Sequence, residues 1–271
     1  MTMKRLLLLL LPVLLLAGCG RSHQPPLETT ESTVAEILET ETRTEEERTE
    51  PEQTAVEDIP TQPEHSPLYL EGIGVEDVIL WFQEVCLDAE FVTGGGDPSR
   101  LQKWAEPIVY RITGPRTQED LLTLEGFCLW LNTVEGFPGI REAEPEEAAN
   151  LRIRFGSEEE MLDRMGDNFY GCDGCVTFWY IADEIYDGDI FIREDLDQFL
   201  RNSVILEELY NGLGPVQDSM LRPDSIIAAQ YSMPQALTAV DELILKLLYH
   251  PDMLCGMTAE ECQQVIRSLY Y

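Results

Sequence analysis

The spacing of apolar residues predicts a series of helices and strands from Val75 onward. Val75–Leu87 has the helical period, with apolar side chains three and four positions apart. A second helix is expected over Leu121–Val134, because Thr117 followed by an acid three residues later is a helix-capping sequence. The same sequence at Thr238–Asp241 and Thr258–Glu261 predicts two more helices toward the C-terminus.

Strands are predicted where apolar and polar residues alternate, or where residues that favour strands are concentrated. Leu151–Phe155 alternates strictly between apolar residues and arginine, as a half-buried strand does. Ile108–Ile112 is short and rich in residues that favour strands. Cys175–Ile181 and Asp189–Ile192 are expected to pair antiparallel across an acidic turn at Asp187-Gly188. The order of elements predicts an α+β domain with a mixed, mostly antiparallel-edged sheet.

The N-terminal residues have the pattern of an export signal. Lys4 and Arg5 precede the apolar run Leu6–Leu16, and its eleven residues are too few to cross a bilayer as a helix, which needs about 20. Leu16-Ala17-Gly18-Cys19 then matches the bacterial lipobox. We expect residues 1–18 to be a lipoprotein signal peptide and Cys19 to carry the lipid that holds the protein on the extracytoplasmic side of a cell membrane. The alternative is an ordinary signal peptide with a chance cysteine.

Residues 19–66 are expected to be a lipidated N-terminus followed by a disordered acidic linker. Residues 21–66 contain thirteen acidic residues, three arginines and no aromatic residue. Such a composition cannot bury enough apolar surface to offset the entropy of ordering. The segment is therefore interpreted as a solvated spacer, with a cation-binding tail as the alternative.

Residues 67–271 are long enough for one globular domain. The formal net charge of the chain is −33, and about −25 of it remains on this domain once the signal and the linker are set aside. A surface of that charge disfavours nucleic acid and anionic lipid headgroups as partners. Cationic ligands, basic peptides or divalent ions remain possible.

One segment, Glu207–Ser219, has the layout of a zinc-protease helix. The metzincin pattern places three histidines around a glutamate and a glycine, as H-E-x-x-H-x-x-G-x-x-H. In this chain Glu208 and Gly214 are in register with the glutamate and the glycine. The three ligand positions hold Glu207, Asn211 and Gln217.

Flanking segments extend this similarity over roughly residues 101–254. They match the opening strand, the methionine turn and the closing helix of such domains, at Trp104–Ile112, Ser225-Ile226-Ile227 and Leu237–Tyr249. The chain thus resembles an uncharacterised bacterial family of secreted or lipid-anchored proteins with a degenerate metzincin-like core. The resemblance implies a zincin-like domain with a degenerate active-site helix. Alternatively, Glu207 and Glu208 decorate an ordinary amphipathic helix.

The side chains at the former ligand positions make a poor zinc site. Zinc favours imidazole and thiolate, whereas carboxylates and amides suit calcium or magnesium. The only histidine in the predicted domain, His250, stands beside a helix end, where a surface or capping role is expected. We therefore expect no metal, no cofactor and no confident catalytic residue, with Glu208 as a candidate remnant of the general base.

Six cysteines follow Cys19, an even number that permits disulfides outside the cytoplasm. Cys172 and Cys175 are the most closely spaced. A redox pair of this spacing normally opens a helix, whereas this one precedes a predicted strand. A disulfide or turn pair between them is expected, with unlinked thiols or a metal or redox role as alternatives.

These features favour a lipid-anchored envelope protein whose non-catalytic, metzincin-like domain binds a peptide or another envelope component. In metzincins an edge strand receives peptide by strand addition, and the aromatic residues Phe178-Trp179-Tyr180 are expected either to line such a groove or to pack in the core. One alternative is a hydrolase with a carboxylate-rich site built on Glu207, Glu208 and Asp218. Another is a structural spacer or surface antigen without a pocket. The discriminating observation is whether Glu207, Glu208, Asn211 and Gln217 converge on one cleft.

Overall fold

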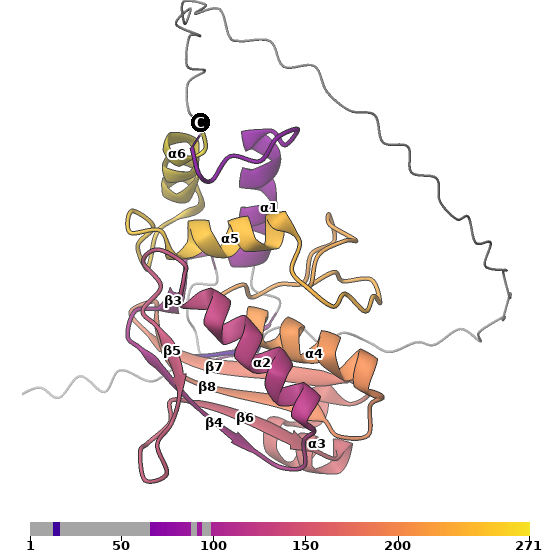
Figure 1. Cartoon of the computed structure of the whole chain (residues 1–271). Helices are drawn as coiled ribbons and strands as arrows, with labels where there is room; N and C mark the ends of the chain where they lie inside the picture. Colours follow the sequence, from indigo (N-terminus) through magenta and orange to yellow (C-terminus); the bar gives the residue numbers. More distant parts are fainter. Residues whose placement is uncertain (1–12, 17–65, 88–90, 94–98) are drawn as a thin grey trace, which may run out of the picture. The chain divides into compact units, whose positions relative to one another are not determined.

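The computed structural model describes residues 13–16, 66–87, 91–93 and 99–271. Within them, eight strands form one sheet in the order β2-β1-β7-β8-β6-β4-β5, with β3 beside β8 (Figure 1). The strands are β1 (Val13–Leu16), β2 (Phe91–Thr93), β3 (Lys103–Trp104), β4 (Ile108–Thr113), β5 (Ile140–Glu142), β6 (Leu151–Gly156), β7 (Gly174–Ile181) and β8 (Glu184–Arg193). Apart from β1, nearly all of the predicted export signal and linker lie outside the described residues.

The sheet is mixed but mostly parallel, so the prediction of a mostly antiparallel-edged sheet is wrong. β4 pairs in parallel with β5 and with β6, and β8 pairs in parallel with β6 and with β3. Antiparallel pairing is confined to β2, β1, β7 and β8. The physical reason is connectivity: α2 (Gln118–Leu131) lies between β4 and β5 in the chain, and such a helical crossover returns the next strand in the same direction.

The predicted antiparallel pairing of two successive strands is confirmed for β7 and β8. Its turn, however, is Ala182-Asp183 rather than Asp187-Gly188. Ala182 and Asp183 have φ angles of 52° and 66°, the left-handed conformation that a two-residue hairpin turn requires. Asp187 and Gly188 instead lie within β8, where they pair with Trp179 and Phe178.

Helices cover both faces of the sheet (Figure 1). α2 and α4 (Gln198–Asn211) pack on the face formed by residues such as Val176, Ile153 and Ile190. α3 (Glu158–Met165) packs on β8 at the opposite face, over a small second core. Its buried members are Met161, Phe169, Cys172, Cys175 and Phe191.

The remaining helices form a group of their own, in which α1 (Val75–Leu87) packs against α5 (Ala239–Tyr249) and α6 (Ala259–Leu269) (Figure 1). The predicted bounds of α1 are confirmed. Capping boxes at Thr117, Thr238 and Thr258 are also confirmed, since each threonine and the acid three residues later hydrogen-bond reciprocally. No helix in the described part of the chain has the length and apolar content needed to cross a bilayer.

The carboxylate of Asp241 joins this helical group to the loop that follows α4. Its Oδ1 accepts hydrogen bonds from Arg222 Nη1 (2.8 Å) and Ser225 Oγ (2.7 Å). Its Oδ2 accepts from the Ile226 amide (3.1 Å) and from the amide and hydroxyl of Thr238 (2.9 and 2.8 Å). Asp241 is fully buried, so every one of these donors depends on a single side chain that water cannot replace.

Replacing Asp241 with asparagine should therefore lower the free energy of unfolding by roughly 3–5 kcal/mol, because the buried Arg222 guanidinium loses its counter-charge. The matched control is Asp224→Asn, which removes the other and exposed carboxylate paired with Arg222 and should cost less than about 1 kcal/mol. Chemical denaturation of both variants measures the difference. Equal losses would show that Asp241 does not hold the loop.

Candidate functional site

Two adjacent glutamates, Glu207 and Glu208, lie on α4 where this helix crosses β7 and β8. Arg201, Ile205 and Glu208 recur at the helical period and are all buried, so Glu208 belongs to the inward stripe of the helix. Its exposed fraction is 1%. The interpretation of both glutamates as surface decoration is therefore wrong for Glu208. Glu207, one position further around the helix, is half-buried.

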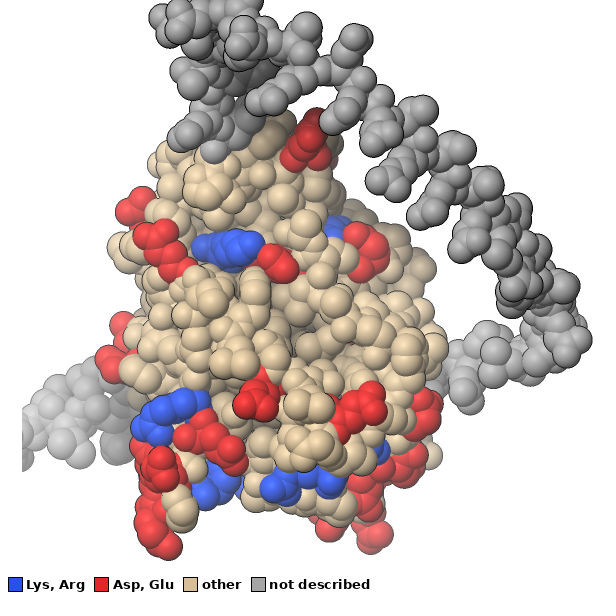
Figure 2. All heavy atoms as spheres, viewed as in Figure 1, with Lys and Arg blue, Asp and Glu red and all other residues tan. Residues whose placement is uncertain are grey.

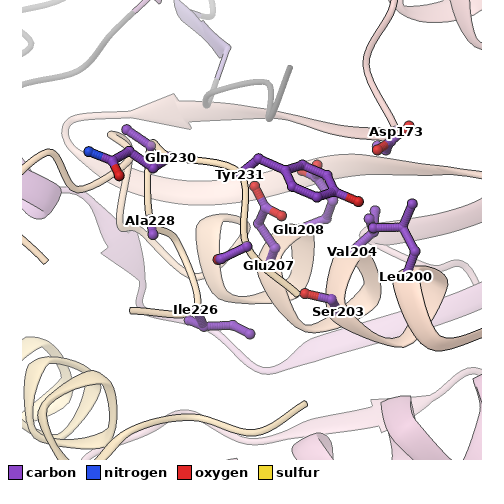
Figure 3. Close-up of a pocket in the computed structure, with 13 residues that line it drawn as sticks. Asp173, Leu200, Ser203, Val204, Glu207, Glu208, Ile226, Ala228, Gln230 and Tyr231 are labelled. Atoms are coloured by element: carbon purple, nitrogen blue, oxygen red, sulfur yellow. The ribbon is translucent and has the colours of Figure 1, made fainter. Parts of the chain in front are cut away.

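Both glutamates line a small pocket between α4, the start of β7 and the loop of residues 226–232 (Figure 3). Its volume is about 30 Å³, which holds roughly two water-sized groups. Asp173 contributes a third carboxyl group from the β7 side, and Ile226 and Leu200 supply apolar walls. Tyr231 also lines the pocket, and in the view of Figure 3 its ring lies in front of Glu208. The pocket is thus small, acidic and lined in part by an aromatic residue.

The carboxyl groups of this pocket resist ionisation. Burial, followed by the charges of Asp218 and Asp173, raises the pKa of Glu207 well above its usual range. Burial also raises the pKa of Glu208, and the adjacent Glu207 carboxyl is the next largest cause. Burial likewise raises the pKa of Asp173. A proton or another positive charge is therefore stabilised between these groups.

Two buried oxygens next to the pocket have no hydrogen-bond partner among the described residues. They are Glu208 Oε2 and Asn211 Oδ1. The Asn211 amide nitrogen makes one long contact, 3.5 Å, to Asp218 Oδ1. A buried acceptor without a donor costs free energy, so Asn211 Oδ1 and the ionised form of Glu208 favour a ligand that donates hydrogen bonds.

The four positions of the zinc-protease pattern converge only in part. Glu207 and Glu208 line the pocket, and Asn211 is buried beside Asp218. Gln217 is half-buried and does not line the pocket. Asp218, the next residue, does not line the pocket either, but its charge raises the pKa of both glutamates.

Sequence reasoning missed Asp173 and Tyr231 as site residues. Asp173 lies between Cys172 and Cys175, and the prediction for that segment rested on the two cysteines alone. Those two are not joined to each other, because Cys175 is a free, fully buried thiol. The predicted Cys172–Cys175 disulfide is therefore wrong. Cys175 packs beside Phe191 in the second core, while Asp173 reaches the pocket.

A zinc ion, which the metzincin resemblance implies, does not fit this donor set. The pocket offers carboxyl groups and no imidazole or thiolate, whereas zinc sites are built mainly from those two ligand types. Across the described residues, no three His, Cys, Asp or Glu side chains are placed to hold one metal ion. The three carboxyl groups surround the pocket without forming a coordination shell.

A second cavity of about 340 Å³ lies between α2 and the loop before α5, with walls such as Leu122, Trp130 and Leu237. On the face shown in Figure 2, charged side chains gather toward the sheet end, and much of the surface above is uncharged. This larger cavity lacks the converging polar groups that a specific site needs. The pocket at Glu207 and Glu208 is therefore the candidate functional site.

Glu208→Gln should stabilise the protein at neutral pH. The folded state holds the Glu208 proton more tightly than the unfolded chain does, so this carboxyl favours folding below about pH 4.5 and loses that contribution as pH rises through the folded pKa. Glutamine has no such loss. We expect a higher melting temperature for the variant at neutral pH, by roughly 2–4 °C for each kcal/mol gained, and convergence with the wild type in acid. Thermal melts across pH test this, with the exposed Glu159→Gln as the control. A pH-independent difference would contradict the buried, raised-pKa assignment.

Gly174→Ala should disturb the pocket by overpacking. A Cβ atom at Gly174 would lie 2.6 Å from Val204 Cγ1 and 2.8 Å from Glu208 Cγ, so α4 and β7 could no longer approach as closely. The expected loss is about 1–3 kcal/mol of unfolding free energy. Gly126→Ala is the control, since Gly126 lies inside α2 with open space around it and should gain up to about 1 kcal/mol. Denaturant titration of both variants measures the opposite signs; a gain at Gly174 would overturn the close-approach argument.

Comparison with known proteins leaves the molecular activity open and settles the kinship. No curated protein matches the chain. A family model described as "Protein of unknown function (DUF2927)" matches residues 76–268, which include all six helices except the first residue of α1 and the last of α6. That match spans the pocket, the Asp241 network and the whole of the sheet from β3 onward. The chain therefore belongs to the DUF2927 family.

Proposed function

We propose that the protein is a cell-envelope lipoprotein whose folded domain binds a peptide through a positively charged side chain, without cleaving it. In this proposal Cys19 carries the lipid and residues 19–66 hold the domain away from the membrane. The domain presents the acidic pocket at Glu207 and Glu208 to a partner outside the cytoplasm. The pocket is the observation that carries the proposal.

The chemistry of the pocket suits a primary ammonium group. Three carboxyl groups line a space of about 30 Å³, and a buried oxygen of Glu208 there has no hydrogen-bond partner within the described part of the chain. An ammonium is close to a water molecule in size and donates three hydrogen bonds, whereas a guanidinium is planar and larger. Tyr231, which also lines the pocket, adds an aromatic ring, and aromatic faces favour cations. Lysine therefore fits this pocket better than arginine.

The outer edge of β7 provides a place for the rest of the peptide. In the structure β1 pairs antiparallel with β7, matching Val13 with Tyr180 and Leu16 with Thr177. β1 falls within the predicted signal peptide, so in the processed lipoprotein this edge is open to another extended segment. A strand continued in the same register runs toward Gly174 and Asp173, which border the pocket.

Kinship with zincins is part of the same proposal. It is supported by the succession of α4, the turn at Ser225–Ile227 and α5, and by the position of Ile226, which links that turn to the pocket wall. The donor set around Glu207 and Glu208 no longer suits zinc, so binding, rather than metal-dependent hydrolysis, is the function that this lineage retains.

A hydrolase with a carboxylate-rich site is the second candidate, because clustered carboxyl groups with raised pKa values in a cleft are typical of acid–base catalysis. Burial and then the neighbouring Glu207 raise the pKa of Glu208, which favours the protonated form that a general acid requires. The pocket is too small to enclose a scissile group together with an attacking water, which favours binding. A structural spacer without a pocket has less support, since the pocket exists.

Binding of lysine peptides to the full chain tests the proposal. We expect a lysine-containing peptide to bind at least about tenfold more tightly than the same peptide with acetyl-lysine or arginine, since a charge-assisted hydrogen bond contributes about 1.5–3 kcal/mol. The affinity should rise with pH, because the ammonium displaces protons from carboxyl groups whose pKa is raised.

Glu207→Gln should remove most of this preference, while the exposed Glu159→Gln should leave it unchanged. Isothermal titration calorimetry in two buffers of different ionisation enthalpy also measures the released protons. Equal binding of lysine and acetyl-lysine peptides would refute the ammonium pocket. Peptide cleavage that disappears in Glu208→Gln would establish the hydrolase instead.

A further inference from the structure

The sheet face opposite α2 and α4 carries a cluster of arginines that the proposed function does not use. In β6, Leu151, Ile153 and Phe155 enter the main core, so Arg152 and Arg154 point to the other face. α3 adds Arg164 on that side, through its contact with Asp189 of β8. Residues 67–271 contain only thirteen lysines and arginines against thirty-eight acidic residues, so three guanidinium groups around one atom are a marked concentration.

These three arginines share one carboxylate. Asp189 Oδ1 accepts hydrogen bonds from Arg152 Nε (2.9 Å) and Arg164 Nη2 (3.1 Å). Arg152 also bonds Asp189 Oδ2 (3.1 Å) and Asp187 Oδ1 (2.5 Å), so it makes three of the four hydrogen bonds by which these arginines hold the two carboxylates. Arg154 Nε lies 3.7 Å from Asp189 Oδ1, beyond hydrogen-bond distance. Three positive groups thus face two carboxylates, and Arg154 has the weakest ion pair.

Arg154 is left with unused hydrogen-bonding capacity. Its Nε is buried and has no hydrogen-bond partner among the described residues. Burial, and then the charges of Arg164 and Arg152, lower the pKa of Arg154 in spite of the nearby Asp189. Its side chain is nonetheless 29% exposed and that of Arg164 is 41% exposed, so an anion from solvent can reach both.

We propose that Arg154 and Arg164 form a second binding site, which takes a compact oxyanion of the phosphate class. Guanidinium groups present planar forks of donors that match phosphate oxygens, and an anion between them supplies the charge and the acceptors that Asp189 alone cannot. The charge of −33 on the whole chain repels extended polyanions, so the ligand is a small group such as inorganic phosphate or a phosphate monoester.

This site is separate from the acidic pocket. Arg152, Arg154 and Arg164 are not among the residues that line the pocket. β7 and β8 contribute to both sites, but with side chains on opposite faces: Ile190 and Ile192 face the main core beneath α4, whereas Asp189 and Phe191 face α3. The two sites therefore share no side chain and lie on opposite faces of the sheet.

Calorimetric titration of the full chain with inorganic phosphate, at constant ionic strength, tests the proposal. We expect saturable binding with one phosphate per chain, weakened at least about tenfold in Arg154→Gln by the loss of a charge-assisted contact. Arg164→Gln should weaken phosphate binding as well. Because Arg164 is more exposed than Arg154, this variant keeps the test valid if Arg154→Gln fails to fold. Arg116→Gln is the control, because Arg116 is exposed and bonds only the Gly114 carbonyl among the described residues.

Glu207→Gln should leave phosphate binding unchanged, although it removes the preference for lysine peptides. The phosphate site and the lysine pocket can therefore be tested separately. The proposal is overturned if wild-type protein shows no saturable phosphate binding, or if Arg116→Gln weakens binding as much as Arg154→Gln does. It is also overturned if Arg164→Gln, folded by its thermal melt, binds phosphate like the wild type.

Discussion

The buried carboxylate of Asp241 is the interaction on which the rest of this architecture depends. It begins α5 through Thr238, neutralises Arg222 and fixes the turn at Ser225 and Ile226 by direct hydrogen bonds. That turn leads into residues 226–232, which close the pocket over α4. A single acid therefore connects the helical group of α1, α5 and α6 to the candidate site. Because both its oxygens are already saturated, it holds the loop in one arrangement rather than several.

The pocket contains a different kind of buried acid. Asp241 is matched by an arginine and by several donors, whereas Glu208 has an oxygen with no hydrogen-bond partner in the described segments and another glutamate beside it. Keeping such a group costs stability, and proteins retain that cost mainly where a ligand or a reaction uses it. The contrast between these two carboxyl groups is the physical basis for placing function at Glu207 and Glu208.

Charge is divided between the two faces of the sheet. The face under α4 concentrates carboxyl groups in a space that suits an ammonium, and the face at α3 concentrates guanidinium groups around Asp189. β7 and β8 carry residues of both faces, since alternate side chains of a strand point in opposite directions. The same short segments thus support two proposed sites of opposite charge in a chain that is strongly acidic as a whole.

Features that depend on residues a few positions apart could be predicted from the chain. The starts of α2, α5 and α6 follow from threonine caps, the alternation of β6 follows from its arginines, and the adjacency of Glu207 and Glu208 on one helix is fixed by the chain. Contacts between distant segments set the parallel order of β4, β5, β6 and β8, left Cys175 a free thiol beside Cys172, and excluded Gln217 from the pocket. They also brought Asp173 to Glu208, because Gly174 lets β7 approach α4 closely. Helix capping and strand alternation depend on residues within a few positions of one another, so a short stretch of sequence contains them. Strand order and the pocket arise from contacts between segments distant in the chain, which no local pattern encodes.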